Sequence, residues 1–110
     1  MKTVTALIRP EQLPAVKKAL FDVQIRHLTA ATVMGTAPKS EQQMYRGVRR
    51  EVELFPRIRV EVSVSDAQLE TVIEAMSRGA KETGGWGRIF VHDLEEIVTI
   101  WTGERGPRAL

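Results

Sequence analysis

The chain has 110 residues, a length that corresponds to one domain with one modest hydrophobic core. Cysteine is absent, which excludes a disulfide framework, a thiolate nucleophile and a cysteine-ligated metal. The net charge of +2 is too weak a basic bias to indicate nucleic-acid binding. No apolar run approaches a membrane span and no basic leader precedes an apolar segment, so we expect a cytoplasmic location.

The first half of the chain predicts a strand, a helix and a second strand. Residues 3–8 (TVTALI) are typical of a strand, which Pro10 ends. Residues 11–22 carry apolar side chains three and four positions apart, as in an amphipathic helix. The apolar and β-branched run 28–34 predicts the next strand. From residue 36 to about 51 the hydrophobic period is lost, and a loop of that length in a compact domain usually has a function.

The second half predicts the same kinds of element again. The alternating segment 58–64 (IRVEVSV) predicts a strand, and Asp66 suits the N-cap of a helix with an apolar stripe over residues 69–80. Residues 89–91 begin a further strand, and residues 97–101 suit a short additional one.

The order β-α-β-β-α-β predicts an α+β fold of the ferredoxin-like kind, with an antiparallel sheet and both helices on one face. The other face would then be uncovered. Valine, isoleucine and leucine are expected on both strand faces, so we expect that face to be buried against further copies of the chain. The pattern therefore favours a homo-oligomer.

A glycine-rich loop, residues 83–88 (TGGWGR), is the first candidate site. Three glycines can present several backbone N–H groups to one anion, and Arg88 adds a positive charge. The alternative is a helix C-cap at Gly84 followed by an ordinary turn. A short glycine cluster alone does not decide between these interpretations.

The long loop is the second candidate, because Arg46, Arg49, Arg50 and Arg57 lie within a dozen residues around Tyr45. It is either a solvated hairpin arm or an arm that reads anions and docks on a partner.

The histidines and tryptophans carry weaker signals. His27 and His92 lack the spacing of a metal site, so neither a metal ion nor a Ser/His/Asp triad is indicated. Trp86 and Trp101 suit either stacking on a base or packing in the core or at a subunit contact.

Five motifs in order carry a resemblance to a known family. They are Ile8-Arg9-Pro10, Tyr45-Arg46-Gly47, the run 55–61 (FPRIRVE), the run 87–91 (GRIFV) and Thr102-Gly103-Glu104. With these motifs at nearly constant spacing, the chain resembles the PII signal-transduction family nearly end to end, as a divergent, PII-like member.

The resemblance implies one PII-like domain over residues 1–110, with a long T-loop at about 36–54, a B-loop at 83–88 and a C-terminal tail at 102–110. It implies a ferredoxin-like homotrimer that binds adenine nucleotide in clefts between neighbouring chains. Such a protein is a regulator rather than an enzyme, and its T-loop docks on a partner transporter or enzyme.

The resemblance also implies a set of residues around the nucleotide. One group lines the base and ribose, a second holds the phosphates, a third consists of the glycine that begins the long loop and two arginines that add charge, and one aromatic residue comes from a neighbouring chain. In that order they are Thr29, Glu61 and Ser63; Thr83, Gly84, Gly85, Gly87 and Arg88; Gly35, Arg46 and Arg57; and Trp101.

Several departures from the family pattern shape the ligand expected. Arg50 stands where the family has its uridylylated tyrosine, and the glutamine that helps hold Mg²⁺ and 2-oxoglutarate is missing. Thr99 and Trp101 replace two phosphate-binding arginines, and the B-loop is two residues shorter. The departures therefore favour ADP or AMP over Mg-ATP, although ATP remains possible, and they weaken the case for Mg²⁺ and 2-oxoglutarate.

Three pathways remain open. Divergent PII-like branches act with carboxysomes or bicarbonate transport, binding ADP or AMP with bicarbonate, and the arginines of the long loop with Arg57 suit such an anion. The first alternative is a nitrogen-regulatory PII protein that senses ATP or ADP with 2-oxoglutarate. The second is a metal-tolerance trimer with no nucleotide site.

Overall fold

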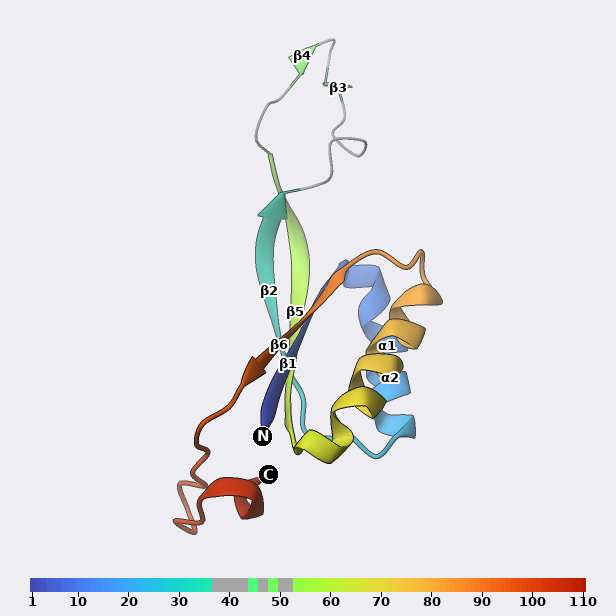
Figure 1. Cartoon of the computed structure of the whole chain (residues 1–110). Coiled ribbons are helices and arrows are strands. Elements are labelled where there is room, and N and C mark those ends of the chain that lie inside the picture. Colours follow the sequence, from blue (N-terminus) through green and yellow to red (C-terminus); the bar gives the residue numbers. More distant parts are fainter. Residues whose placement is uncertain (37–43, 46–47, 50–52) are drawn as a thin grey trace.

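The structure is a computed structural model, and it describes residues 1–36, 44–45, 48–49 and 53–110. The main elements are β1 (Lys2–Ile8), α1 (Leu13–Asp22), β2 (Thr29–Thr36), β5 (Leu54–Val64), α2 (Leu69–Lys81) and β6 (Arg88–Asp93). Two short strands, β3 (Met44–Tyr45) and β4 (Val48–Arg49), pair with each other between β2 and β5 in the sequence. The predicted ferredoxin-like order of elements is confirmed (Figure 1).

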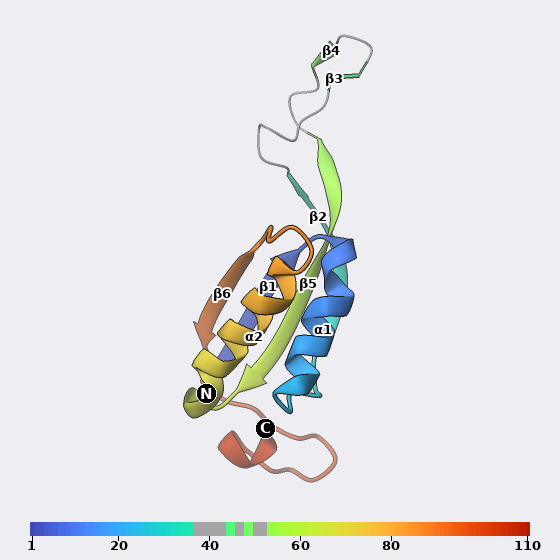
Figure 2. The ribbon, with the colours of Figure 1, turned by 90° about the vertical axis from the view of Figure 1, so that its right-hand side faces the viewer.

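The four main strands form one antiparallel sheet in the order β2-β5-β1-β6. The register places Thr5 of β1 opposite Glu61 of β5 on one side and opposite Phe90 of β6 on the other. Both α-helices lie on the same face of this sheet (Figure 2). The turn from α2 into β6 therefore comes to the end of the sheet where β2 stops and β5 starts (Figure 1).

The core lies between the helices and the sheet, because the apolar residues of the central strands fall mainly on alternate positions that face the helices. The buried apolar side chains come from β1, β5 and the facing sides of both helices, and they include Val4, Ala6, Ile8, Val60, Val62, Val64, Val16, Leu20, Val72 and Met76. Full burial of a valine, leucine or methionine side chain contributes about 1.5–3 kcal/mol by removing apolar surface from water.

Gly79 lets the two helices approach closely. A Cβ atom built there would lie 2.7 Å from the Cα of Val16, a distance at which no side chain fits. The glycine therefore has a packing role within α2, which offsets its low helix propensity.

The uncovered face of the sheet corrects the expectation that it would be apolar. The outward positions of β5 are Arg57, Arg59, Glu61 and Ser63, because its valines and Ile58 all point toward the helices. Leu7, Val33 and Phe90 contribute apolar surface on the same face, so this face is mixed. The expectation was wrong because apolar content was counted along the chain, whereas each central strand divides its apolar and polar residues between two faces.

Two local expectations were also wrong. Asp66 does not cap a helix with its side chain: it begins the single-turn 3₁₀ helix η3 (Asp66–Gln68), and its carboxylate accepts a hydrogen bond from the N-terminal ammonium at 3.0 Å. Residues 97–101 form no strand. They belong to a turn closed by one isolated bridge between Val98 and Arg105, because Gly103 and Gly106 reverse the chain before a ladder can extend.

Candidate functional site

The glycine-rich loop follows α2 and leads into β6. Gly84, Gly85 and Gly87 have φ angles of +86°, +69° and +134°, values that side-chain-bearing residues rarely adopt. At Gly87 a Cβ atom would also lie 2.5 Å from the carbonyl oxygen of Leu7. Glycine is therefore needed at this position both for its backbone angle and for the close approach of the loop to β1.

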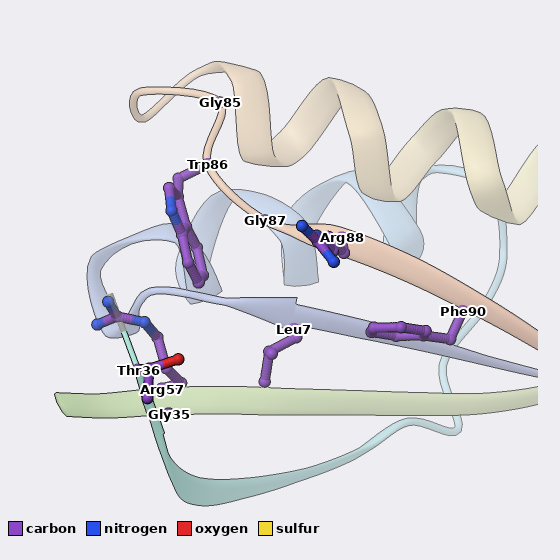
Figure 3. Close-up of a pocket in the computed structure, with 9 residues that line it drawn as sticks. All are labelled: Leu7, Gly35, Thr36, Arg57, Gly85, Trp86, Gly87, Arg88 and Phe90. Atoms are coloured by element: carbon purple, nitrogen blue, oxygen red, sulfur yellow. The ribbon is translucent and has the colours of Figure 1, made fainter. Parts of the chain in front are cut away.

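A cavity of about 680 Å³, which we call the loop cavity, lies between this loop and the sheet (Figure 3). Its walls come from β1, the end of β2, the start of β5, the loop and β6, and the lining residues are Leu7, Gly35, Thr36, Arg57, Gly85, Trp86, Gly87, Arg88 and Phe90. Two of them are arginines and none is acidic. Such a lining favours an anionic ligand.

Arg57 is the most unusual side chain in the loop cavity, because only 6% of it is exposed to solvent. Its Nη1 donates a hydrogen bond to the Pro56 carbonyl oxygen at 3.0 Å, while its Nε is buried and has no hydrogen-bond partner among the described residues. The guanidinium lies 4.5 Å from the Trp86 ring centroid and 5.7 Å from that of Phe55. Stacking accounts for the faces of the group but leaves the Nε edge unsatisfied, and an oxyanion would satisfy it.

Trp86 is in contact with a second cation. The Arg9 guanidinium carbon lies 5.2 Å from the centroid of its ring, so Trp86 contacts arginines from the end of β1 and from β5. Figure 3 shows the ring directed from the loop toward Arg57. The side chain therefore joins the glycine-rich loop to the residue that follows β1 and to the start of β5.

Gln12 is a residue of this region that the sequence did not indicate. It is completely buried, and its side chain accepts a hydrogen bond from the Arg9 N–H and donates to the carbonyl oxygens of Ala80 and Trp86. A glutamine three residues after Arg9 and two after Pro10 resembles the N3 member of a capping box, which was the only available signal.

The structure brings together some of the predicted site residues. Gly35, Arg57, Gly85, Gly87 and Arg88 all line the loop cavity. A second cavity of about 410 Å³ on the uncovered sheet face shares Gly35 with it and adds Glu61. Leu7 and Phe90 also line both cavities. The two cavities are therefore neighbours, and Glu61 lies in the one that continues the loop cavity along the sheet face.

Other predicted residues lie apart from the loop cavity. Thr83 and Gly84 belong to the glycine-rich loop but do not line the cavity. Thr29 lies opposite Glu61 in the register, and Ser63 lies two residues further along β5. Arg46 and most of the proposed T-loop lie outside the described residues.

The segment that follows β6, which contains Trp101, lies at the opposite end of the sheet from the turn between α2 and β6 (Figure 1). Trp101 is 87% exposed and Ile100 is 91% exposed. We call residues 96–106 the C-terminal turn. Within it the Thr99 N–H donates to the Glu104 carbonyl at 2.9 Å, and the Gly106 N–H donates to the Ile97 carbonyl at 3.0 Å. The tip is thus held by its own backbone and touches little else in the chain.

Ion pairs at this end lower the pKa values of three carboxyl groups. A hydrogen bond from Arg105, at 3.0 Å, lowers the pKa of Glu96. The N-terminal ammonium lowers the pKa of Asp66, and Lys2 lowers the pKa of Asp93 while its own pKa is raised. Within one chain, the positive charge of Arg105 is therefore paired with Glu96.

The two histidines lie apart from each other and from the loop cavity. His27 contacts the Ser63 carbonyl through Nε2 at 3.0 Å, and His92 lies on the uncovered sheet face. No cluster of three His, Cys, Asp or Glu side chains suited to a metal ion occurs among residues 1–36, 44–45, 48–49 and 53–110. Within those same ranges, no helix has the length and apolarity needed to cross a membrane.

The fold, with a glycine-rich loop beside the ends of β2 and β5, is the ferredoxin-like arrangement anticipated from the motifs. The family model described as "Nitrogen regulatory protein P-II" matches residues 1–104, so the chain belongs to the P-II family of signal-transduction proteins. The trimer expected from the sequence is consistent with this assignment.

Relatives and a solved structure agree with the assignment over the full chain. Nitrogen regulatory protein GlnK1 of Methanosarcina mazei is 41% identical, covering 100% of this chain and 97% of that protein. Nitrogen regulatory protein P-II of Rhizobium meliloti is 40% identical over the whole of both chains. The crystal structure of Arabidopsis thaliana PII bound to citrate matches with a TM-score of 0.79 and 30% identity, covering 99% of this chain and 91% of that one.

Proposed function

We propose that this P-II protein is a homotrimeric, ligand-responsive regulator that binds an adenine nucleotide between neighbouring chains and signals through the segment 36–54. The loop cavity is the observation that carries the proposal. It joins the glycine-rich loop to Gly35 and Arg57, which stand at the two ends of that segment. A ligand in the cavity would therefore contact both the element that holds phosphate and the stem of the element that meets a partner.

The phosphates of the nucleotide would be held by the glycine-rich loop. Positive φ angles at Gly84, Gly85 and Gly87 turn successive peptide units, and Arg88 follows as the cation. Thr99 and Trp101 are uncharged and stand where the family has phosphate-binding arginines. The large side chain of Trp86 lines the loop cavity. Fewer cations neutralise fewer phosphates, which supports ADP or AMP over Mg-ATP as the ligand.

A second, small anion is proposed at Arg57. Its Nε edge is buried and unpartnered among the described residues, which suits a planar oxyanion such as bicarbonate or a carboxylate. The similar Arabidopsis PII is described as bound to citrate, a carboxylate ligand, which supports an oxyanion here. Bicarbonate remains the favoured second ligand because the family's glutamine for Mg²⁺ and 2-oxoglutarate is missing.

Nitrogen regulation is the second candidate function, and the names of the relatives favour it. Proteins 37–41% identical to this chain in Methanosarcina, Rhizobium and Rhodospirillum are called nitrogen regulatory proteins. In that function the nucleotide would be ATP or ADP and the second ligand 2-oxoglutarate. The choice between the two candidates therefore depends on the second ligand, since both use the same cavity.

The regulator would act in the cytoplasm without catalysing a reaction, and its partner would be a membrane transporter or an enzyme. Its output is a change in which proteins the 36–54 segment binds. Nucleic acid is not part of the proposal, because the net charge is only +2.

Isothermal titration calorimetry tests the proposal directly. ATP, ADP and AMP are each titrated into the purified protein with and without bicarbonate and with and without 2-oxoglutarate and Mg²⁺. Binding of ADP or AMP that bicarbonate strengthens supports carbon sensing, whereas Mg-ATP binding strengthened by 2-oxoglutarate supports nitrogen sensing. Absence of binding by all three nucleotides would overturn the proposal and favour a metal-tolerance trimer, which a metal titration then tests.

A further inference from the structure

Gln12 lies where three segments of the chain meet at the loop end of the sheet. It ends the single-turn 3₁₀ helix η1 (Pro10–Gln12), which connects β1 to α1. Its side chain is completely buried, although a glutamine amide is costly to bury unless its polar atoms are hydrogen bonded. The hydrogen bonds of this buried amide therefore indicate what the residue does in the fold.

The amide of Gln12 bonds to all three segments. Its Oε1 accepts from the Arg9 N–H at 2.7 Å, and its Nε2 donates to the Ala80 carbonyl at 3.1 Å and to the Trp86 carbonyl at 2.8 Å. Arg9 follows β1, Ala80 lies in the last turn of α2, and Trp86 lies in the glycine-rich loop. One side chain therefore links residues 68 and 74 positions away in the sequence.

These bonds fix both ends of the glycine-rich loop. The Ala80 carbonyl also accepts from the Gly85 N–H at 3.0 Å and the Thr83 N–H at 3.2 Å, so the start of the loop turns around the oxygen that Gln12 holds. The end of the loop is held at the Trp86 carbonyl, one residue before Gly87 passes β1. Without the amide, the start of the loop would keep its backbone bonds to Ala80, but the Trp86 carbonyl would lose the hydrogen bond from the Gln12 side chain.

The position of the Trp86 ring depends on the same bonds. With its carbonyl held by Gln12, the residue directs its ring toward Arg57 (Figure 3), with the ring centroid 4.5 Å from the guanidinium carbon of Arg57 and 5.2 Å from that of Arg9. The backbone of Arg9 is bonded to Gln12 as well. The backbones of Trp86 and of Arg9, one of its two arginine partners, are therefore both bonded to the buried amide of Gln12.

We propose that Gln12 is the positioning residue of the glycine-rich loop. It contacts no ligand, since it does not line the loop cavity. It holds the loop so that its backbone and Trp86 face the cavity and Arg57 remains stacked beneath the ring. The effect on ligand binding rests on the nucleotide site proposed above, whereas the effect on Trp86 does not.

Gln12→Glu is the sharpest test, because the change keeps the shape of the side chain. The carboxylate still accepts from the Arg9 N–H, but its second oxygen faces the carbonyl oxygens of Ala80 and Trp86 and cannot donate to them. The variant is made in a Trp101→Phe background, where Trp86 is the sole tryptophan. We expect a red shift of the Trp86 emission and a Kd for ADP about tenfold weaker, the size that loss of one to two hydrogen bonds gives.

Val64→Ala in the same background is the matched control. Val64 is fully buried at the other end of β5, where it lies opposite Lys2, so its truncation lowers stability without touching the loop. We expect its melting temperature to fall while its Trp86 emission and its Kd for ADP stay at the background values. If Gln12 contributed only to the overall stability of the fold, Gln12→Glu would resemble Val64→Ala, with a lower melting temperature but unchanged Trp86 emission and an unchanged Kd for ADP.

The outcomes separate this inference from the proposed function. Unchanged Trp86 emission in folded Gln12→Glu would overturn the inference, whatever the protein binds. Absence of nucleotide binding by the natural protein, which keeps Trp101, would overturn the proposed function, while the emission in the Trp101→Phe background still decides the role of Gln12. If Gln12→Glu does not fold, the side-chain NH₂ resonances of Gln12 are followed in the natural protein: a shift when ADP is added supports the inference, and no shift overturns it.

Discussion

The glycine-rich loop and the C-terminal turn each carry one tryptophan, and the surroundings of the two side chains differ sharply. Trp86 is half-buried, contacts two arginines and has its carbonyl bonded to a buried glutamine. Trp101 is 87% exposed, on a turn held only by its own short-range bonds. A single chain therefore completes the surroundings of Trp86, whereas Trp101 has surface that only another molecule can cover.

The comparison divides the proposed nucleotide site into two contributions. The loop cavity with its two arginines is built within one chain, whereas Trp101 does not line it and, under the proposed function, would reach the nucleotide from a neighbouring chain. Variants at the loop end should therefore change the fold of one chain and ligand binding together. Variants at the C-terminal turn should change ligand binding and leave the fold of the unliganded protein intact.

The largest expected effect comes from Gly87→Val. The new side chain combines a φ angle of +134° with a Cβ atom 2.5 Å from the Leu7 carbonyl oxygen, so the loop must leave β1. We expect the free energy of unfolding to fall by about 3 kcal/mol, measured by urea denaturation. Gly84→Ala is the control: its φ is also positive, but nothing lies within 4 Å, so it should cost only about 1 kcal/mol. Equal losses in the two variants would contradict the close approach.

The two tryptophans themselves give the next largest effect. Trp86→Ala removes packing and two cation–π contacts, and we expect it to lower the free energy of unfolding by about 2 kcal/mol. Trp101→Ala should leave the stability of the nucleotide-free protein within about 0.5 kcal/mol, as expected for an exposed site, but reduce the rise in melting temperature that ADP produces. A large loss of stability in nucleotide-free Trp101→Ala would place that side chain in a permanent contact instead.

A gain of affinity is expected when charge is restored at the C-terminal turn. The double variant with Thr99→Arg and Trp101→Arg should bind ATP about tenfold more tightly, because charge-assisted bonds to phosphate contribute about 1.5–3 kcal/mol. Ile100→Arg with Thr102→Arg adds the same charge to the same turn at other positions and should give less than a threefold change. Calorimetric Kd values compare the two. Equal gains would show that net charge, rather than position, sets the affinity.

The smallest effect is a pH dependence of the C-terminal turn. Arg105 lowers the pKa of Glu96 below its ordinary value of 4.5, so the contribution of the pair is present above that value and is lost as the pH falls through the lower, folded-state pKa. Glu96 also accepts from the Gly106 N–H at 3.1 Å. The hydrogen-exchange protection of Gly106 should therefore fall on acidification in the natural protein, and less in Glu96→Gln. Parallel pH profiles would contradict a role of the charge.

The order of elements and the core of the sheet could be predicted from the sequence because both depend on local periodicity. The alternation over residues 58–64 predicts the inward and outward sides of β5, and the apolar spacing over residues 69–80 predicts the buried side of α2. The glycines of the loop were predicted as a possible anion site and as a turn. Both interpretations remain compatible, since Gly85 bonds back to α2 while it lines the cavity.

Contacts between distant segments could not be predicted in the same way. Nothing in the run around Gln12 indicates that its amide meets Trp86, because the contact exists only after β1 and α2 have packed. Asp66 has the residue type of a helix cap, but the nearby N-terminal ammonium attracts its carboxylate. Residues 97–101 of the C-terminal turn have the residue types of a strand. The glycines of the turn and the Glu96–Arg105 pair reverse the chain before more than one bridge of a strand ladder can form.

The central claim is that the glycine-rich loop and Arg88 bind the phosphates of an adenine nucleotide. Titration of ADP into the natural protein, Arg88→Ala and Arg78→Ala tests it most directly. Arg78 lies on the exposed side of α2, 3.5 Å from Glu74, so its variant controls for the loss of one positive charge. We predict that Arg88→Ala weakens ADP binding by about tenfold or more and that Arg78→Ala leaves it unchanged. Equal affinities for ADP in all three proteins would contradict the claim.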